Sequence, residues 1–110
     1  MARGSSLTRG EIWWARMPPP DKTRAVILVS REEAYPRREY VIVAPVTTHA
    51  RGIAAEIALD ASEGLPRPSV ANCDSLETIA QSRLVRRIGR LSTHRSDDLD
   101  AALKFALGLD

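Results

Sequence analysis

The chain has 110 residues, 44% of them hydrophobic and 27% charged, which predicts one globular domain and excludes a disordered chain. Its net charge of +2 divides into +5 for residues 1–95, with 15 basic and 10 acidic residues, and −3 for residues 96–110, with one basic and four acidic residues. The sequence predicts no membrane span, no signal peptide, no internal disulfide and no zinc site of the usual spacing, because apolar runs are short, Cys73 stands alone and the two histidines are far apart.

The first half of the chain predicts three strands. Residues 11–17 are aromatic and apolar, and the prolines at 18–20 end this strand because proline supplies no ladder donor. Residues 25–29 form a continuous apolar run, which predicts a strand that is buried on both faces or a central strand under a helix. Residues 40–47 predict a third strand, in which Pro45 indicates an edge position or a bulge near the end.

The second half predicts three shorter strands and one helix. The strands cover residues 55–59, 69–73 and 85–91, and residues 76–84 predict a short helical turn followed by a connection. Apolar residues then recur at helical spacing, at Leu99, Ala102, Leu103, Ala106 and Leu107.

The ends of this helix carry their own signals. The aspartates at 97, 98 and 100 suit its positive end, which explains most of the acidic charge of the tail. Gly108 is predicted to end the helix. Its N-cap is Ser92 or Ser96, and the sequence does not decide between them.

These elements together predict a small, strongly curved antiparallel sheet or partly open barrel, covered on one face by the C-terminal helix. Adjacent strand residues point to opposite faces, so only one of Trp13 and Trp14 can enter a given core. The other tryptophan is either an interface or stacking platform, or is shielded by the helix or a loop.

Polar side chains follow the predicted strand ends and can meet at one rim of such a barrel. They are Arg24, then Thr47, Thr48 and His49, then Asn72, Cys73, Asp74 and Ser75. An arginine, a hydroxyl and a carboxylate suit cleavage of RNA, which carries its own 2′-hydroxyl nucleophile, because the guanidinium fork can hold the charged phosphorane. Each residue also has a plainer interpretation: a solvated arginine or histidine, a strand-end threonine, or an Asx-turn aspartate.

Six segments in order add to this interpretation: Arg9–Trp14, Lys22–Ser30, Val43–Thr48, Ser69–Asp74, Ser82–Leu84 and Arg90–Ser92. Their residues and spacing resemble the MazF/PemK (Kid) toxins of bacterial type II toxin–antitoxin modules, from about Arg9 to the C-terminus. The resemblance implies a mainly β fold with a C-terminal helix, namely the twisted antiparallel sheet of the MazF/CcdB type, an SH3-like, partly open barrel. It implies a flexible segment at residues 1–8 and a single toxin domain at residues 9–110.

The resemblance also implies a function. The chain is expected to be a metal-independent, cofactor-free endoribonuclease that cleaves single-stranded RNA sequence-selectively, leaves 2′,3′-cyclic phosphate and 5′-hydroxyl ends, and inhibits translation and growth. Arg24 and Thr47 match the catalytic arginine and threonine of the family, and Asp74 matches an acidic position used by the PemK branch. We expect RNA contacts from Asp21, Lys22, Thr48, His49, Arg51, Asn72 and Ser75. The expected partners are messenger, transfer or ribosomal RNA, a second copy of the chain and an acidic cognate antitoxin, in the bacterial cytoplasm and away from any membrane.

The chain departs from the family pattern in three places. Ala25 stands where the family has proline after the arginine, the loop at 18–23 lacks the family's glutamate, and Ser75 stands where relatives often have glutamine. The general base therefore stays open among Arg24, Asp74, His49 and Asp21. Two other functions are weighed against the ribonuclease: a family member that binds RNA or antitoxin without cutting, and a CcdB-like gyrase poison, for which the C-terminus lacks the aromatic-glycine ending.

Overall fold

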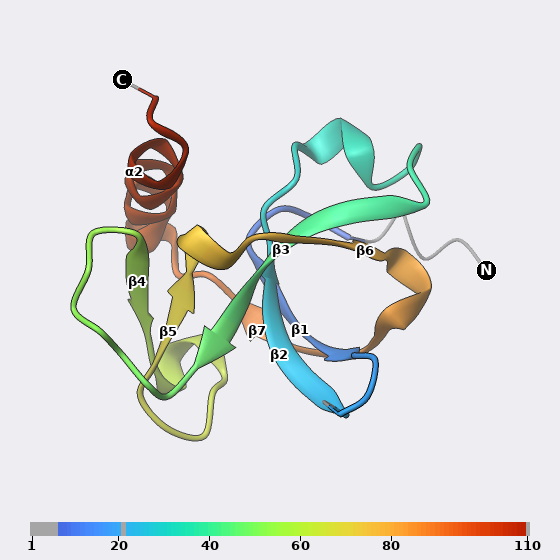
Figure 1. The fold of residues 1–110 in the computed structure, drawn as a ribbon, viewed down its shortest axis with the longest axis horizontal. Coiled ribbons are helices and arrows are strands. Elements are labelled where there is room, and N and C mark those ends of the chain that lie inside the picture. Colours follow the sequence, from blue (N-terminus) through green and yellow to red (C-terminus); the bar gives the residue numbers. More distant parts are fainter. Residues whose placement is uncertain (1–6, 21, 110) are drawn as a thin grey trace.

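The structure is a computed structural model that describes residues 7–20 and 22–109. Within these residues the chain forms one curled antiparallel sheet of seven strands, followed by a single α-helix, α2 (Ser96–Leu107) (Figure 1). The strands are β1 (Glu11–Arg16), β2 (Thr23–Leu28), β3 (Tyr40–Thr47), β4 (Glu56–Leu59), β5 (Ser69–Asn72), β6 (Glu77–Ala80) and β7 (Leu84–Arg90). This arrangement confirms the predicted fold class.

The order of strands in the sheet is β4-β5-β3-β2-β1-β7, and β6 pairs with β3 beside β5. The helix α2 lies against the β4–β5 end of the sheet, where it also contacts the turn at residues 73–75 (Figure 1). No helix among the described residues is both long and apolar enough to cross a lipid bilayer.

Strand β2 is buried on both faces, as its continuous apolar run predicts. Ala25 and Ile27 point into a first core cluster, which also contains Leu99 and Ala102 of α2. The alternate residues Val26 and Leu28 belong to a second cluster on the opposite face. Two separate cores therefore hold the middle of the sheet in place.

Trp13 and Trp14 divide between these two cores. Trp13 packs against the second cluster, and its indole Nε1 donates a hydrogen bond to Oε1 of Glu11 at 3.0 Å. Trp14 packs against the first cluster. Both side chains are half-buried, so each uses one face for packing and leaves part of its surface open.

Two features of β3 and its neighbours differ from the sequence prediction. Residues 77–80 form the strand β6 and not a helical turn, because Ile79 packs into the second core while β6 pairs with Tyr40–Val43 of β3. Pro45 lies opposite Val26 in the interior of the sheet and not at an edge. Its missing N–H is tolerated because Pro45 lies between the segment of β3 that pairs with β6, Tyr40–Val43, and the segment that pairs with β5, Val46–Thr47.

The two ends of the chain also refine the prediction. A 3-10 turn at Thr93–Arg95 precedes α2, so neither Ser92 nor Ser96 is its N-cap, and Arg95 occupies that position. Gly108 closes the helix as predicted. Leu7 is buried in the second core and Thr8 donates a hydrogen bond to Glu11, so the packed domain begins before Arg9. Residues 1–6 of the expected N-terminal segment lie outside the described residues.

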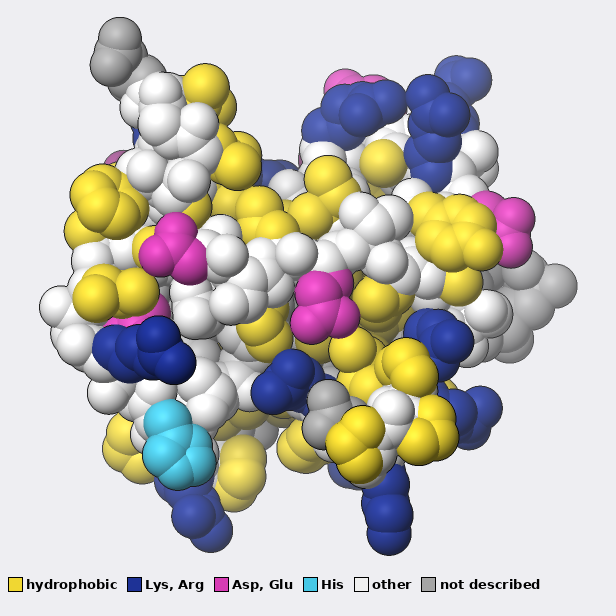
Figure 2. Space-filling view, in the orientation of Figure 1, with side chains coloured by type: hydrophobic (Ala, Val, Ile, Leu, Met, Phe, Trp, Pro, Cys, Tyr) yellow, Lys and Arg dark blue, Asp and Glu magenta, His cyan; other side chains and the backbone are white. Residues whose placement is uncertain are grey.

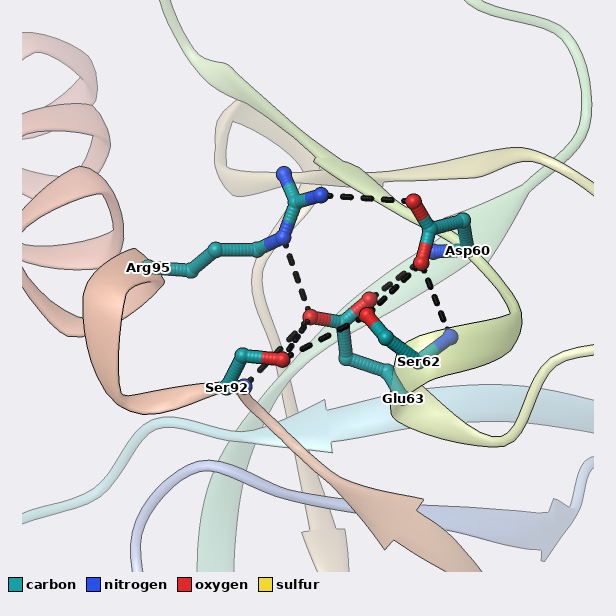
Figure 3. A network of polar contacts seen from close by, with 5 residues as sticks. All are labelled: Asp60, Ser62, Glu63, Ser92 and Arg95. Carbon is teal, nitrogen blue, oxygen red and sulfur yellow. Dashed lines mark hydrogen bonds and ion pairs between the residues drawn. The ribbon is translucent and has the colours of Figure 1, made fainter.

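A buried carboxylate, Glu63, connects three segments of the chain (Figure 3). Its Oε1 accepts a hydrogen bond from the backbone N–H of Asp60 at 2.9 Å, and its Oε2 accepts one from Oγ of Ser92 at 2.6 Å. Nε of Arg95 lies 3.0 Å from the same Oε2, and Nη2 of Arg95 reaches Asp60 at 3.4 Å. We call this set the Glu63 network; it joins the β4–β5 connection to the end of β7 and the start of α2.

The β4–β5 connection also packs against β7, and the backbones of the two segments are in direct contact. A Cβ built on Gly89 would lie 2.1 Å from the carbonyl oxygen of Glu63, and one on Gly64 would lie 2.6 Å from that of Ile88. Gly64 also adopts a φ of 94°, a value that side chains disfavour. Glycine at both positions lets the turn at 61–64 sit directly on the strand, which brings Glu63 within reach of Ser92.

The Glu63 network predicts acid-sensitive stability. Burial alone would raise the pKa of Glu63, but the hydrogen bonds from Ser92 and the Asp60 backbone, together with Arg95, hold this pKa below its ordinary value. The unfolded chain therefore binds the proton at a higher pH than the folded chain, and the stabilisation present at neutral pH is lost as pH falls. We expect Glu63→Gln to lower the free energy of unfolding at pH 7 by about 2 kcal/mol, measured by urea denaturation.

The pH dependence separates the charge from the shape of the side chain. The difference in unfolding free energy between Glu63→Gln and the wild type narrows as pH falls through the lowered pKa of Glu63, since neither folded chain then carries the carboxylate charge. Glu33→Gln, at an exposed residue, is the matched control and leaves the curve unchanged. A gap that stays constant from neutral to acid pH would contradict the role of the charge.

Candidate functional site

Two adjoining hollows open where β2 and β3 reach the same rim of the sheet. Arg24, Thr47 and His49 line both of them, so these three side chains form the wall that the hollows share. The first, here called the apolar hollow, encloses about 380 Å³ and is walled by Trp14, Ala25, Val46, Leu65 and Pro66, with Lys22, Thr23, Thr48, Arg67 and Ser69 around them. The second, the polar hollow, also encloses about 380 Å³ and adds Pro45, Arg51, Asn72, Ser75 and Glu77.

Arg24 is held by the β1–β2 ladder. Its backbone lies opposite Ala15, and the next pair is Trp14 with Ala25. The backbone N–H of Met17 donates to the carbonyl of Lys22 at 2.9 Å and closes the hairpin just before Arg24. Ala25 therefore takes its place from strand pairing, without the proline ring that the family pattern has there.

The guanidinium of Arg24 makes no ion pair or hydrogen bond with any residue in the described ranges 7–20 and 22–109. The four ion pairs within those ranges involve Arg9, Arg87 and Arg95. Arg24 is half-buried at the shared wall, and its planar fork of donors is available to an anion.

Thr47 and His49 form a paired unit beside Arg24. The backbone N–H of His49 donates to Oγ1 of Thr47 at 3.1 Å, and Oγ1 lies 3.4 Å from Nδ1 of the His49 ring. These contacts turn the chain sharply after β3 and hold the imidazole at the rim. Histidine is the side chain used most often for general acid–base catalysis, so the unit brings a hydroxyl and a proton carrier to the same wall.

The turn that follows is fixed by Glu56 of β4. Oε1 and Oε2 of Glu56 each accept a hydrogen bond from the backbone N–H of Arg51 at 3.1 Å, and Oε1 accepts another from Gly52 at 3.0 Å. The carboxylate thus binds the backbone of the turn and leaves the Arg51 side chain to line the polar hollow.

The lining of the two hollows is strongly basic. Lys22, Arg24, Arg51 and Arg67 line one or both, whereas Glu77 is the only acidic residue among the described lining residues. In Figure 2, Lys and Arg side chains project along the lower edge, where Figure 1 places the end of β3 and the β1–β2 turn. Such a rim suits a polyanion, because cationic side chains attract and hold phosphates.

Most residues predicted for the site do meet there. Those that line a hollow are Arg24, Thr47, Lys22, Thr48, His49, Arg51, Asn72 and Ser75. Asp74 is exposed and lines neither hollow, although Asn72 and Ser75 of the same turn line the polar hollow; its backbone N–H donates to Oδ1 of Asn72 at 2.9 Å. Asp21 lies outside the described residues.

Sequence reasoning did not place ten of the lining residues in the site, and three of those ten carry an aromatic ring or a charge. Trp14 was expected either at an open surface or under cover, Arg67 lies in a loop, and Glu77 lies in the strand β6 that the sequence did not predict. A period-2 pattern over residues 77–80, with Ile79 inward, was the signal available for Glu77.

Other reactive groups lie away from the hollows or are inert. Within the described part of the chain, no three His, Cys, Asp or Glu side chains form a group that could hold a metal ion. Cys73 is buried in the first core, and burial raises the pKa of its thiol to about 11. A thiol of this kind stays protonated at neutral pH and serves packing.

Comparison with known proteins gives the same result for sequence and for structure. The model of the family described as "PemK-like, MazF-like toxin of type II toxin-antitoxin system" matches residues 8–107. Two relatives from Mycobacterium tuberculosis are the probable endoribonuclease MazF5, 41% identical over 90% of this chain and 91% of that protein, and the endoribonuclease MazF3, 42% identical over 82% and 87%.

Solved structures share the fold. The Mycobacterium tuberculosis toxin MazF-mt6 has a TM-score of 0.84 and 40% identity, covering 91% of this chain and 98% of that one. A mycobacterial endoribonuclease solved in complex with its cognate antitoxin has a TM-score of 0.85 over 96% and 98% of the two chains, at 23% identity. The curled sheet and its helix are therefore shared across a wide range of sequences.

Proposed function

The chain belongs to the PemK-like, MazF-like toxins of type II toxin–antitoxin systems and is an endoribonuclease toxin, and we propose that it cuts single-stranded RNA at the wall shared by the two hollows. One observation carries the choice of place. Arg24, Thr47 and His49 line both hollows, so a strand that occupies both must pass its phosphate over these three side chains.

The proposed reaction is an intramolecular phosphoryl transfer within the RNA. The 2′-oxygen attacks the adjacent phosphorus and gives its proton to a base, while the bond from phosphorus to the 5′-oxygen breaks and that oxygen gains a proton. The products are a 2′,3′-cyclic phosphate and a 5′-hydroxyl. Arg24 donates to the oxygens of the charged phosphorane and the Thr47 hydroxyl donates a further bond, which stabilises the transition state where charge develops.

The proton carriers are the second part of the proposal. The resemblance assigns Asp74, an exposed residue of the turn after β5 whose members Asn72 and Ser75 line the polar hollow. His49 and Glu77 already line the polar hollow beside Arg24. The three residues lie on different elements, His49 and Glu77 in the polar hollow and Asp74 on the adjoining turn, and the variants below distinguish them.

The partners follow from the charge of the rim. We propose that a cognate acidic antitoxin covers the same basic side chains as RNA does, since both ligands are anionic and Lys22, Arg24, Arg51 and Arg67 line the hollows. The mycobacterial relative of the same fold is itself solved with its cognate antitoxin. We further propose that the chain acts as a homodimer in the bacterial cytoplasm, on messenger, transfer or ribosomal RNA.

Arg24→Ala is expected to reduce RNA cleavage by a hundredfold or more, because it removes the donors to the phosphorane. Arg24→Lys is expected to recover only part of the rate, since an ammonium keeps the charge but loses the paired donors. The measurement is the single-turnover rate on a long RNA whose 5′ ends are mapped, in EDTA. Cleavage by Arg24→Ala at the wild-type rate would overturn the site.

Asp74→Asn, His49→Asn and Glu77→Gln test the proton carriers by their pH profiles. The variant that loses the base is expected to lose the acidic limb of the rate–pH curve, and a variant that loses the acid the basic limb, each with a fall of about 100-fold in rate. A variant of an uninvolved residue keeps the wild-type shape. Circular dichroism and sedimentation confirm that each variant folds and assembles as the wild type does. Three unchanged profiles would mean that Arg24 or Asp21 carries the proton.

Arg51→Ala is expected to weaken RNA binding and to lower the slope of log affinity against log salt by about 0.7, the value for one phosphate contact on a single strand. Arg37→Ala, at an exposed arginine of the β2–β3 connection, is the control for a general loss of positive charge. Fluorescence anisotropy at several salt concentrations measures both. Identical slopes for the two variants would contradict a phosphate contact by Arg51.

A further inference from the structure

We propose that Glu56 is a positioning residue for RNA binding. Its carboxylate holds the loop between β3 and β4 so that the Arg51 side chain already lies in the polar hollow when RNA arrives. The inference rests on the proposed cleavage of RNA at the shared wall. It adds a residue that contacts neither the RNA nor the reacting atoms, and that determines how tightly RNA is held and not how fast it is cut.

The loop has little other support. Residues 48–54 are exposed and form neither a strand nor a helix. Short-range hydrogen bonds hold its two ends: the backbone N–H of His49 donates to Thr47, and the carbonyl of Ile53 accepts from the backbone N–H of Glu56 at 3.1 Å. The middle of the loop, which carries Arg51, is held by the carboxylate of Glu56.

Two successive backbone N–H groups bind this carboxylate. The backbone nitrogen of Arg51 lies 3.1 Å from each carboxylate oxygen of Glu56, and the N–H of Gly52 donates to Oε1 at 3.0 Å. Consecutive N–H groups that converge on one anion form a concave nest, which uses a residue in the left-handed conformation. Gly52 supplies that conformation with a φ of 73°. The nest therefore fixes the direction of the backbone from which the Arg51 side chain extends into the polar hollow.

The carboxylate binds the backbone of Arg51 and leaves its guanidinium available. Within residues 7–20 and 22–109, no ion pair or hydrogen bond involves that guanidinium, so its donors can meet a phosphate. An ion pair between the two side chains would instead occupy these donors. Glu56 itself lines a third hollow, which lies against α2, and neither of the other two. It therefore acts on RNA through Arg51.

The opposite wall of the polar hollow is anchored beside Glu56 but does not need its side chain. The backbone of Glu56 pairs with Asn72, which lines that wall. The backbone N–H of Cys73 donates to the carbonyl of Ala55 at 2.9 Å and ties the following turn to the start of β4. A change of the Glu56 carboxylate leaves these backbone bonds in place. Its effect is therefore expected to fall on the Arg51 loop alone.

Glu56→Gln tests this role, because it keeps the shape of the side chain but removes its charge and one acceptor oxygen. We expect the affinity for an uncleavable 2′-deoxy oligonucleotide to fall about 10-fold, as for loss of one charged hydrogen bond. The slope of log affinity against log salt is expected to fall by about 0.7, the value for one phosphate contact. The single-turnover rate at saturating RNA is expected to stay within about twofold, because the groups at the cut phosphate are unchanged.

A double-mutant cycle with Arg51→Ala shows whether Glu56 acts through that side chain. Glu56→Gln is expected to weaken binding in the wild-type background and to have no further effect once Arg51 is alanine. Glu33→Gln makes the same chemical change at an exposed residue of the β2–β3 connection and is the matched control. Circular dichroism and sedimentation compare the folding and assembly of each variant with those of the wild type.

Gly52 offers an independent variant that leaves the carboxylate in place. A Cβ at this residue would meet nothing within 4 Å, so Gly52→Ala introduces no clash and acts through the φ of 73° alone. It is expected to weaken RNA binding as Glu56→Gln does, again only while Arg51 is present. Gly52→Asn, which tolerates a positive φ better, is expected to bind closer to the wild type. These variants test the nest even where Glu56→Gln does not fold.

The outcomes separate the two proposals. Unchanged affinity and salt slope in Glu56→Gln, beside a loss in Arg51→Ala, overturns the positioning role and leaves the RNA site standing. Additive losses in the cycle also overturn it, since Glu56 then acts elsewhere, and so does a fall in the saturated cleavage rate at unchanged affinity. If the cycle behaves as expected while Arg24→Ala cuts as fast as the wild type, the proposed place of cleavage is wrong and the positioning role in RNA binding stands.

Discussion

The shape of the apolar hollow depends on the contacts that the Glu63 carboxylate makes. This carboxylate is buried, yet it accepts hydrogen bonds from the Asp60 backbone and from Ser92 and faces the guanidinium of Arg95. A buried charge is tolerated only when such partners replace water, so the three segments that supply them are held together. The turn that carries Glu63 continues into residues 65–67, which form one wall of the apolar hollow. The contacts of the Glu63 side chain therefore help to fix the position of this wall.

The side chains that the two hollows share with the proposed site lie at the ends of strands. Arg24 comes from the start of β2, Thr47 from the end of β3 and Asn72 from the end of β5, and pairing in the sheet brings these ends to one rim. Ladder pairing and two cores hold the backbones rigid, while the side chains extend to the solvent. A rigid frame with open donors suits electrostatic stabilisation of a phosphorane, because the donors need no rearrangement as charge develops.

The sequence predicted the fold well where local patterns decide it. The apolar run of β2, the limits of β3 and the stripe of α2 each follow from burial and periodicity, and all are observed. β6 was missed because four residues are too few for a reliable period. Pro45 was assigned to an edge or a bulge because its position between the β6 and β5 pairings depends on tertiary structure.

The site residues likewise fall into those that the sequence could predict and those that depend on tertiary structure. Arg24 and Thr47 could be named from the family resemblance, and strand pairing does bring them together. The Glu63 network could not be foreseen, since it joins side chains about thirty residues apart whose separate signals are those of an ordinary turn and a helix start. The lining by Trp14 likewise follows from register and curvature, which no local pattern records, and the only local signal for Glu77 was the short pattern of β6.

The central claim is that RNA lies across the wall formed by Arg24, Thr47 and His49. NMR titration of the labelled chain with an uncleavable 2′-deoxy oligonucleotide tests it most directly, because backbone amides report contact residue by residue. The account predicts that the largest shift changes fall on residues 22–25, 47–51 and 65–69, with little change in α2. Changes centred on α2 and on the third hollow, which Phe105 of α2 and Ile57 of β4 line, with the β2 and β3 ends unaffected, would contradict it.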